Sequence, residues 1–357
     1  MKITKAECWM QHIKLSEPYT IAYETINYCT NVFMRAETDI GLTGWGCAAP
    51  DKYITGETGE DVMKSFNEII EPMIKGSDPG RYIFLIDELK LQLKKRSSAM
   101  AMIDMLLYDL IARKAKLPLY QLLGGYHTSI PTSITIGILP VETTVEKAKA
   151  FIRNGFKILK IKGGIQLEED IEKITKVRNA VGKEVEIRFD ANQGYTVNEA
   201  LEFIKRTTDF QIELLEQPTI KENEELLGKI SRNVSVPVMA DESLMTLKDV
   251  FRLTSNDLVD MINIKLMKVG GITEGMHINS VAKSAGVESM VGCMDESALG
   301  ISAGLHFALS RPNIVYADLD GHLDLIDDPF NGLIKLIDGI LYPGNDSGLG
   351  NCENFLK

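Results

Sequence analysis

The runs EIRFD (186–190), IELLE (212–216) and VMAD (238–241) are three short, largely apolar segments that each end in a carboxylate. The carboxylates belong to Asp190, Glu216 and Asp241, which are 26 and 25 residues apart. That interval is the length of one strand-helix unit, and the carboxyl ends of successive strands in a parallel barrel face the same rim. We therefore expect the three acidic side chains to converge at one end of a barrel.

The same interval continues on both sides of these runs. Short β-branched stretches occur at 133–138, 157–161, 185–189, 211–215, 236–240, 259–264, 287–291 and 314–317. Helical patterns at 144–153, 168–180 and 199–205 lie between them, and strand-helix alternation is typical of a parallel sheet. No glycine-rich phosphate loop follows any of the strands, which disfavours an open doubly wound sheet. The sequence thus predicts the α/β class and a (β/α)8-type barrel.

A smaller domain precedes the barrel. Residues 1 to about 55 have the pattern of strands, and from 60 to about 117 the apolar period changes to that of helices. The segment 117–125, with Pro118 and the Gly124, Gly125 pair, breaks the helical pattern as a linker does. We expect an α+β capping domain over 1–125 that shapes substrate specificity and a catalytic barrel over 126–324. We expect a C-terminal segment, from about 325 to 357, to pack on the capping domain.

Composition limits the kinds of partner. The 357 residues are 45% apolar and 25% charged, as in a compact globular protein, and the formal charge of -11 disfavours nucleic acid and anionic membranes. No apolar run reaches the roughly 18 to 20 residues that span a bilayer, so we expect a cytoplasmic protein. The five cysteines and five histidines are scattered, without the spacing of a zinc site or a redox pair. A small molecule is the expected partner, and a homo-oligomer is the expected assembly.

The three strand-end carboxylates are best explained by a metal ion. Asp190, Glu216 and Asp241 would repel one another and raise one another's pKa values unless a cation balanced their charge. Magnesium (Mg2+) prefers oxygen ligands in octahedral geometry and keeps positions open for water and substrate. The alternative is that each acid caps a helix or lies in a solvated loop. Three acids in register favour the metal site over that alternative.

Lysines end the strands on either side of the acidic set. The preceding strand ends Lys160-Ile161-Lys162, and the following strand ends in Lys265, 24 residues after Asp241. Residues two apart on a strand point the same way, so Lys160 and Lys162 can both face the barrel mouth. A lysine is more often a solvated surface charge, but the end of a buried strand is not where such a charge is expected.

Together these residues suit removal of a proton beside a carboxylate. If the substrate carboxylate binds magnesium, the metal and Lys160 would stabilise the second negative charge of an enediolate. The nearby cation and ammonium groups would lower the pKa values of Lys162 and Lys265, so that a neutral lysine acts as the base. Bases on opposite faces of one carbon permit epimerisation.

These lysines and three longer motifs resemble the enolase superfamily, in its muconate lactonising subgroup. The motifs are Asp190-Ala191-Asn192-Gln193-Gly194, Glu216-Gln217-Pro218 and Asp241-Glu242-Ser243. The resemblance covers nearly the whole chain, and it implies the modified TIM barrel of that superfamily. A Lys or His base with a magnesium-stabilised enediolate is general in the superfamily. Asn192 and Glu242 are expected to support the metal ligands.

Within the subgroup the chain looks most like the dipeptide epimerases. The last predicted strand ends Asp318-Leu319-Asp320, which resembles the Asp-x-Asp pair that holds the substrate α-ammonium in that family. Two carboxylates pair well with an ammonium group and would repel a muconate or succinylbenzoate substrate. The alternatives left open are a muconate cycloisomerase or o-succinylbenzoate synthase of the same subgroup, and a catalytically silent barrel that binds a carboxylate ligand or a protein partner.

The resemblance also extends to the segments that would surround the substrate. The matching segments are 54–58 and 293–297, the second with Met294, Asp295 and Glu296, and the expected side-chain pocket faces the loop around 18–26. Family members that act on Ala-Glu carry an arginine in that loop, where this chain has Glu24. A carboxylate there would repel an acidic side chain, so the resemblance predicts that Ala-Glu is disfavoured and that apolar, neutral or cationic dipeptides are preferred. Other residues expected to shape this pocket are Tyr19, Tyr23, Asp51 and Asp295.

Overall fold

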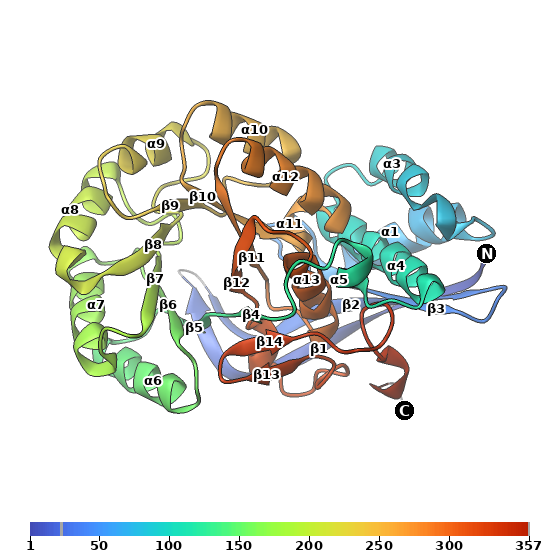
Figure 1. Ribbon diagram of the computed structural model, residues 1–357, viewed down its shortest axis with the longest axis horizontal. Helices are drawn as coiled ribbons and strands as arrows, with labels where there is room; N and C mark the ends of the chain where they lie inside the picture. Colours follow the sequence, from blue (N-terminus) through green and yellow to red (C-terminus); the bar gives the residue numbers. More distant parts are fainter. Residues whose placement is uncertain (22–23, 356–357) are drawn as a thin grey trace.

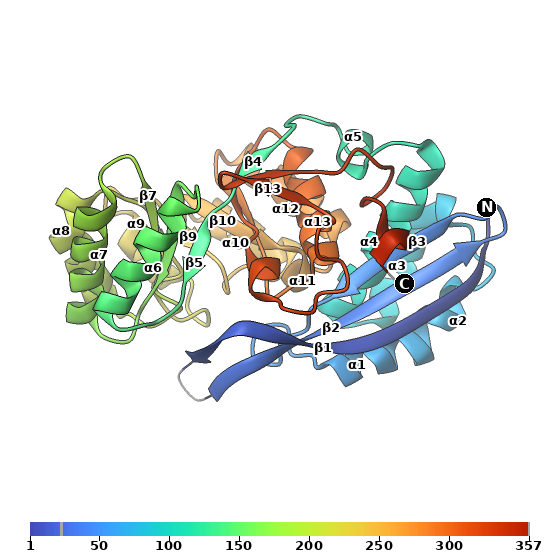
Figure 2. The same ribbon diagram turned by 90° about the horizontal axis from the view of Figure 1, so that it is seen from below.

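The computed structural model describes residues 1–21 and 24–355, and it describes side chains outside 18–26 and 354–357. The chain forms an antiparallel three-stranded sheet with helices, followed by a parallel eight-stranded barrel (Figure 1). Figure 2 shows the sheet lying along one side of the barrel. The predicted (β/α)8-type barrel with a separate N-terminal α+β domain is confirmed.

The N-terminal sheet contains β1 (Ile3–Ile21), β2 (Glu24–Thr38) and β3 (Thr43–Ala48). The long helix α4 (Ser97–Ala115) packs on it and is buried along almost its whole length. Two glycines of β3 allow this close approach, because a Cβ atom on Gly46 would lie 2.0 Å from the main-chain oxygen of Met102. The remaining helices of this domain are α1 (Gly59–Ser65), the π-turn η1 (Phe66–Ile70), α2 (Glu71–Ile74), the short η2 (Pro79–Arg81), α3 (Tyr82–Gln92) and α5 (Leu119–Leu122).

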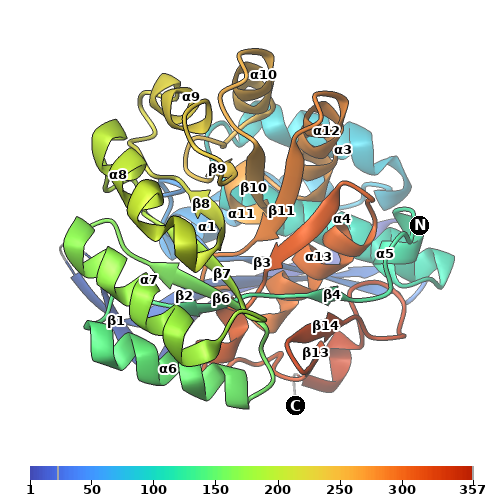
Figure 3. The ribbon, with the colours of Figure 1, turned by 60° about the vertical axis from the view of Figure 1, so that its left-hand side comes forward.

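The barrel strands follow one another in sequence order around the sheet (Figure 3). They are β5 (Ile134–Ile136), β6 (Ile158–Lys162), β7 (Glu186–Asp190), β8 (Ile212–Glu216), β9 (Val238–Ala240), β10 (Met261–Lys265), β11 (Glu288–Gly292) and β12 (Ile314–Asp318). Each lies within one or two residues of its predicted position. A parallel bridge between Thr132, just before β5, and Ala317 of β12 joins the two ends of the sheet, so the barrel is nearly closed.

Helices connect the strands and cover the outside of the barrel. They are α6 (Val141–Arg153), α7 (Leu167–Val181), α8 (Val197–Thr207) with η3 (Thr208–Phe210), α9 (Glu225–Ser231), α10 (Leu247–Ser255), α11 (Leu266–Val269), α12 (Ile272–Ser284) and α13 (Ala298–Leu309). Capping boxes start two of them, with Thr196 and Glu199 on α8 and Thr246 and Asp249 on α10. The helix α13 is buried on every side because its sequence is apolar all round and it packs against both the barrel and β3.

The C-terminal segment closes the molecule. After β12 come the short η4 (Gly321–Asp324) and the hairpin β13 (Lys335–Ile337) and β14 (Ile340–Tyr342), which pairs with β4 (Ile130–Pro131). Its main chain then returns to α4, where Arg113 donates to the Gly350 carbonyl at 2.7 Å, before η5 (Cys352–Phe355). The boundaries 1–125, 126–324 and 325–357 remain predictions. None of the helices in the described ranges is long and apolar enough to cross a membrane.

Candidate active site

The three predicted metal ligands lie on one rim of the barrel. Asp190 is the last residue of β7, Glu216 is the last residue of β8, and Asp241 directly follows β9. Strand pairing places Asp190 beside Glu216, and all three residues are at most 2% exposed. The one-unit spacing read from the sequence therefore brings the acids to neighbouring strand ends, as expected.

Lys160 bridges acids from three strands. Its Nζ atom lies 2.8 Å from Glu216 Oε2, 2.9 Å from Asp318 Oδ2 and 3.2 Å from Asp190 Oδ2. Burial by itself lowers the pKa of the Lys160 ammonium, but Asp318, Glu216 and Asp190 together raise it well above its ordinary value. Lys160 is thus a fixed positive charge at the bottom of the site.

Asp241 is held by two lysines. Lys265 Nζ lies 2.8 Å from Asp241 Oδ2, and the buried Lys268 contacts both Oδ1 and the main-chain oxygen of Asp241. Lys268 was not predicted, although its place three residues after Lys265, on the helical turn that begins where β10 ends, is a usable signal. The side-chain oxygen of Gln217 accepts from the amide of Asp241 at 2.9 Å and so fixes the start of this loop.

The acid-lysine pairing changes one expectation about the bases. Burial lowers the pKa of Lys265, but Asp241 and the other acids outweigh burial and the neighbouring Lys160, and the pKa lies above its ordinary value. The protein's own groups therefore do not lower the pKa of Lys265, and the lowered pKa expected from the sequence would depend on the bound cation. For Lys268 burial dominates, and with Lys265 nearby it lowers the pKa of that ammonium.

Lys162 and Lys265 lie on opposite sides of the barrel. Their strands, β6 and β10, are four positions apart in the nearly closed barrel of eight strands. Lys162 pairs with Asp190 in strand register, and both lysines are partly exposed, unlike Lys160. The two side chains thus approach the mouth from opposite directions, which is the arrangement expected of two bases acting on one carbon.

The donor set fits a hard divalent cation. Oxygen atoms of carboxylates are the ligands that magnesium prefers, and the rim holds four acids, with Glu242 beside Asp241. Buried Glu242 Oε2 accepts no hydrogen bond from any described residue, and Glu216 Oε2 has Lys160 as an ion-pair partner. Burial, with repulsion from Asp241 and Asp190, raises the pKa of Glu242 to about 7, and burial together with those two acids likewise raises that of Glu216 to about 7. Negative charge at this rim is therefore incompletely balanced by the protein.

The carboxylates do not form a preassembled cage. Within 1–21 and 24–355, no three acidic, imidazole or thiol groups already have the spacing of metal ligands. Ammonium groups lie among them instead, with Lys160 between Asp190 and Glu216 and with Lys265 on Asp241. Binding of a cation would require these ion pairs to rearrange.

The Asp-x-Asp pair ends β12 next to Lys160. Asp318 accepts from Ser133 Oγ at 2.6 Å in addition to its contact with Lys160, and Asp320 accepts from the amide of Thr135 at 2.6 Å. Burial raises the pKa of Asp318, but Lys160 outweighs it and the net shift is downward. For Asp320 burial and the adjacent Asp318 raise the pKa to about 7. A positively charged group at Asp320 would be stabilised, as the predicted ammonium site requires.

The residues predicted around the substrate differ in what they contact. Asp51 Oδ1 accepts from the amides of Tyr53 and Ile54, so this acid holds its own turn. Glu296 is 2% exposed and accepts from the amide of Met294 at 3.0 Å, which also holds its own loop.

Four further residues were predicted at the site: Asn192 at the rim, and Tyr19, Tyr23 and Glu24 within 18–26. The Asn192 amide donates to Asp190 Oδ1 at 3.0 Å, in a left-handed conformation with φ of 42°, and so helps to orient the Asp190 carboxylate. Tyr23 lies outside the described residues. The side chains of Tyr19 and Glu24 also lie outside them, although their main chains pair in the β1–β2 hairpin.

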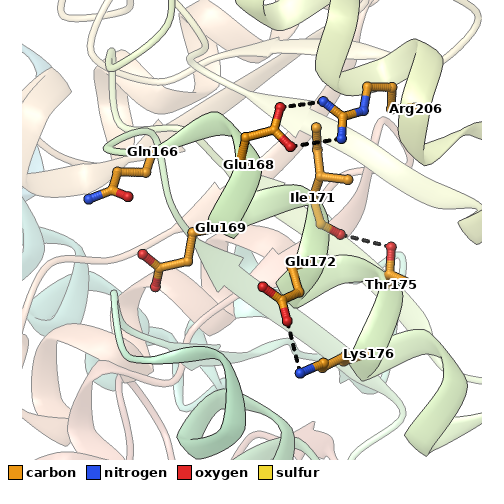
Figure 4. Close-up of a pocket in the computed structure, with 8 residues that line it drawn as sticks. All are labelled: Gln166, Glu168, Glu169, Ile171, Glu172, Thr175, Lys176 and Arg206. Carbon is orange, nitrogen blue, oxygen red and sulfur yellow. Dashed lines mark hydrogen bonds and ion pairs between the residues drawn. The ribbon is translucent and has the colours of Figure 1, made fainter.

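A surface hollow of about 540 Å³ lies elsewhere, on the outer helices α7 and α8 (Figure 4). Its charged side chains are paired with one another, for example Glu168 with Arg206 and Glu172 with Lys176. It is separate from the barrel rim and holds none of the predicted site residues.

Family models match both parts of the chain. Residues 4–124 match the N-terminal domain of mandelate racemase / muconate lactonizing enzyme, and residues 143–351 match the enolase C-terminal domain-like model. This chain belongs to the enolase superfamily. The resemblance read from the strand-end motifs is thereby confirmed.

Relatives within this superfamily are epimerases of dipeptides. The L-Lys-D/L-Arg epimerase of Desulforapulum autotrophicum is 40% identical over 351 residues, which cover 98% of this chain and 99% of the relative. A crystal structure of the dipeptide epimerase from Enterococcus faecalis, complexed with Mg and L-Leu-L-Tyr, has a TM-score of 0.95 at 39% identity and covers 98% of this chain and 99% of that one. The substrate-liganded L-Ala-D/L-Glu epimerase of Bacillus subtilis has a TM-score of 0.95 at 37% identity and covers 98% of both chains. Of these three relatives, one is named for Lys-Arg, one for Ala-Glu, and one is complexed with L-Leu-L-Tyr, so overall similarity does not select the substrate side chain.

Proposed function

We propose that this enolase-superfamily protein is a magnesium-dependent dipeptide epimerase, an isomerase that inverts the α-carbon of the C-terminal residue of a dipeptide. The observation that carries the proposal is the position of Asp318 and Asp320, which end a barrel strand beside Lys160 and the rim carboxylates. An ammonium site next to a carboxylate site matches the two charged ends of a dipeptide. The dipeptide epimerases among the relatives support the same reading.

The rim acids would hold the metal. Asp190, Glu216 and Asp241 are the ligands we propose, with Asn192 and Glu242 as their supports. Bound magnesium would polarise the substrate carboxylate and neutralise part of the charge that develops on it. Lys160, buried and positively charged, would stabilise the same developing charge from the protein side.

Two lysines would move the proton. One of Lys162 and Lys265 takes the α-proton on its Nζ atom, and the other delivers a proton to the opposite face of the carbon. Each must be neutral when it accepts a proton, so Lys265 has to leave its ion pair with Asp241 before it can act. Asp318 and Asp320 would fix the ammonium end, so that the α-carbon lies between the two bases.

The proposed substrate side chain is apolar, neutral or cationic, and Ala-Glu is disfavoured. The support is the sequence position Glu24, where members acting on Ala-Glu carry an arginine, because two carboxylates would repel each other. Relatives named for Lys-Arg and for hydrophobic dipeptides fit this preference. No contact favours a muconate or succinylbenzoate substrate or a silent barrel. A cytoplasmic location and a homo-oligomer remain predictions.

Solvent-deuterium incorporation into a dipeptide library tests the proposal. With magnesium present, we expect mass spectrometry to find one deuterium at the C-terminal residue of apolar or cationic dipeptides and much less in Ala-Glu. Chelation of the metal should abolish the exchange. Absence of exchange in every dipeptide would refute epimerase function, and rapid exchange in Ala-Glu would refute only the proposed preference.

A further inference from the structure

Asn31 connects the N-terminal sheet to a loop at the mouth of the barrel. It lies on β2, is fully buried, and contacts the residues 293–297 that follow β11, here called the β11 loop. Its Nδ2 donates to the main-chain oxygen of Asp295 at 3.0 Å, and its Oδ1 accepts from the amide of Ser297 at 2.9 Å. One side-chain amide therefore satisfies a donor and an acceptor of the loop backbone, two residues apart.

The β11 loop lies against the proposed ammonium site. Gly292, at the end of β11, pairs with Asp318, and Cys293 Sγ lies 4.0 Å from Asp320 Oδ1. The contact is close, because a Cβ atom on Gly321 would lie 2.3 Å from the main-chain oxygen of Met294. A displacement of this loop would therefore change the surroundings of Asp320.

The loop also has contacts within itself and to the C-terminal segment. Ser297 Oγ donates to Asp328 Oδ1 at 2.5 Å, and the Glu296 carboxylate accepts from the Met294 amide at 3.0 Å. Asn31 adds hydrogen bonds from the N-terminal sheet. Its Nδ2 lies 3.4 Å from Cys29 Sγ, and its Oδ1 lies 3.4 Å from Cys47 Sγ. The geometry of a planar amide with two fixed partners leaves it one orientation.

We infer that Asn31 is a positioning residue that sets the β11 loop, and through it the selectivity for the dipeptide side chain. The substrate named in this inference rests on the proposed function, whereas the hydrogen bonds between Asn31 and the β11 loop do not depend on it. Loss of the amide leaves the Asp295 carbonyl and the buried Ser297 amide without these partners, so the loop samples other positions. Selectivity then falls, because the β11 loop no longer forms a fixed wall that favours some dipeptide side chains over others.

The matched control is Thr273→Val. Thr273 is also buried and also forms a hydrogen bond between the two parts of the molecule, from its Oγ1 to Asp104 Oδ1 at 2.6 Å. It lies at the start of α12, not in the β11 loop. A general loosening of the domain contact should therefore appear in both variants, whereas displacement of the β11 loop should appear only on changing Asn31.

Hydrogen exchange and kinetics test the inference on Asn31→Ala, with Asn31→Asp as a second variant that keeps the acceptor for Ser297. We expect the peptide that contains the Ser297 amide to exchange about tenfold faster in Asn31→Ala, the effect of one lost hydrogen bond. The ratio of kcat/KM between an apolar and a cationic dipeptide should move toward one through KM, with kcat within about threefold and Thr273→Val unchanged in both readouts. Asn31→Asp should shift the exchange rate and the kcat/KM ratio in the same direction as Asn31→Ala does. Unchanged exchange, or equal shifts in Thr273→Val, would overturn the inference. If wild-type protein turns over no dipeptide, the exchange result still decides whether Asn31 fixes the loop.

Discussion

Lys160 Nζ lies 2.9 Å from Asp318 Oδ2, so the lysine proposed to stabilise the developing negative charge is also paired with an acid proposed to bind the substrate ammonium. The same Nζ contacts Glu216 and Asp190. The Lys160 side chain contacts both the proposed metal ligands and an acid of the proposed site for the substrate ammonium. A change at one of these two sites should therefore alter the other. The consequences differ for the two acids of the Asp-x-Asp pair.

Asp320→Asn should weaken dipeptide binding with little damage to the rim. Asp320 has no ion pair with Lys160 among the described contacts, and its loss removes a charge-assisted hydrogen bond to the substrate. We expect KM to rise roughly 10- to 100-fold, the range for a hydrogen bond to a charged group. An N-acetylated dipeptide, which lacks the ammonium group, is the control and should be equally poor with both proteins. Full activity on free dipeptides after replacing both Asp318 and Asp320 with alanine would contradict the assignment.

Lys268→Met should weaken magnesium binding. Lys268 contacts Asp241 through both Oδ1 and the main-chain oxygen, and so fixes the orientation of a proposed ligand. Loss of such a support typically costs about 10- to 100-fold in metal affinity, which isothermal titration calorimetry can measure. Lys173→Met is the matched control, since Lys173 is equally buried but pairs with Asp170 and Glu169 on α7. Equal loss of affinity in both variants would show that Lys268 has no particular role.

Without metal, the protein should lose stability as pH rises from about 5 to about 8. Burial raises the pKa values of Glu242, Glu296 and Asp320 to about 7 in the folded protein, above their ordinary values of 4.5, 4.5 and 3.8. A raised carboxyl pKa means that the folded state binds more protons in this window, so stability falls as those protons leave. Asp318, whose pKa is lowered, acts below this window. Burial lowers the pKa values of His306 and His322 to about 3 and about 4, from an ordinary value of 6.5, so these two groups oppose the loss of stability in the lower part of the window and are outnumbered by the acids.

Thermal unfolding in the presence of a chelator tests this expectation. The melting temperature should fall across the window, and added magnesium should restore more of it at pH 8 than at pH 5, because the metal binds the ionised carboxylates. Glu242→Gln should flatten the profile. A melting temperature that rises from pH 5 to pH 8 without metal would contradict the prediction.

The sequence predicted what depends on local patterns. Strands, helices and the strand-end acids Asp190, Glu216 and Asp241 follow from apolar periodicity and from a repeat of constant length, both of which can be read along the chain. The strand-end position of Asp318 follows from the same pattern, whereas the ammonium-binding role expected of Asp318 and Asp320 came from the family resemblance.

Contacts that depend on closure of the barrel or on the second domain were not predicted. Lys160 meets Asp318 because the two ends of the barrel sheet come together, and a contact between residues 158 apart cannot be predicted from sequence spacing. In the sequence Asn31 is an ordinary polar residue of a predicted strand, and only the structure shows its contact with the β11 loop. The lowered pKa expected for Lys265 depends on a bound cation and stays a prediction, because among the protein's own groups the pairing with Asp241 outweighs the neighbouring ammonium.

The most direct test of the two-base arrangement uses Lys162→Ala and Lys265→Ala separately, with the two stereoisomers of one dipeptide in deuterated water. Since these lysines approach from opposite sides of the barrel, each variant should lose epimerisation and should exchange the α-proton of one stereoisomer only, with the opposite stereoisomer retained by the other variant. Epimerisation that survives in either variant, or exchange of the same stereoisomer by both, would contradict the placement of one base on each face of the substrate carbon.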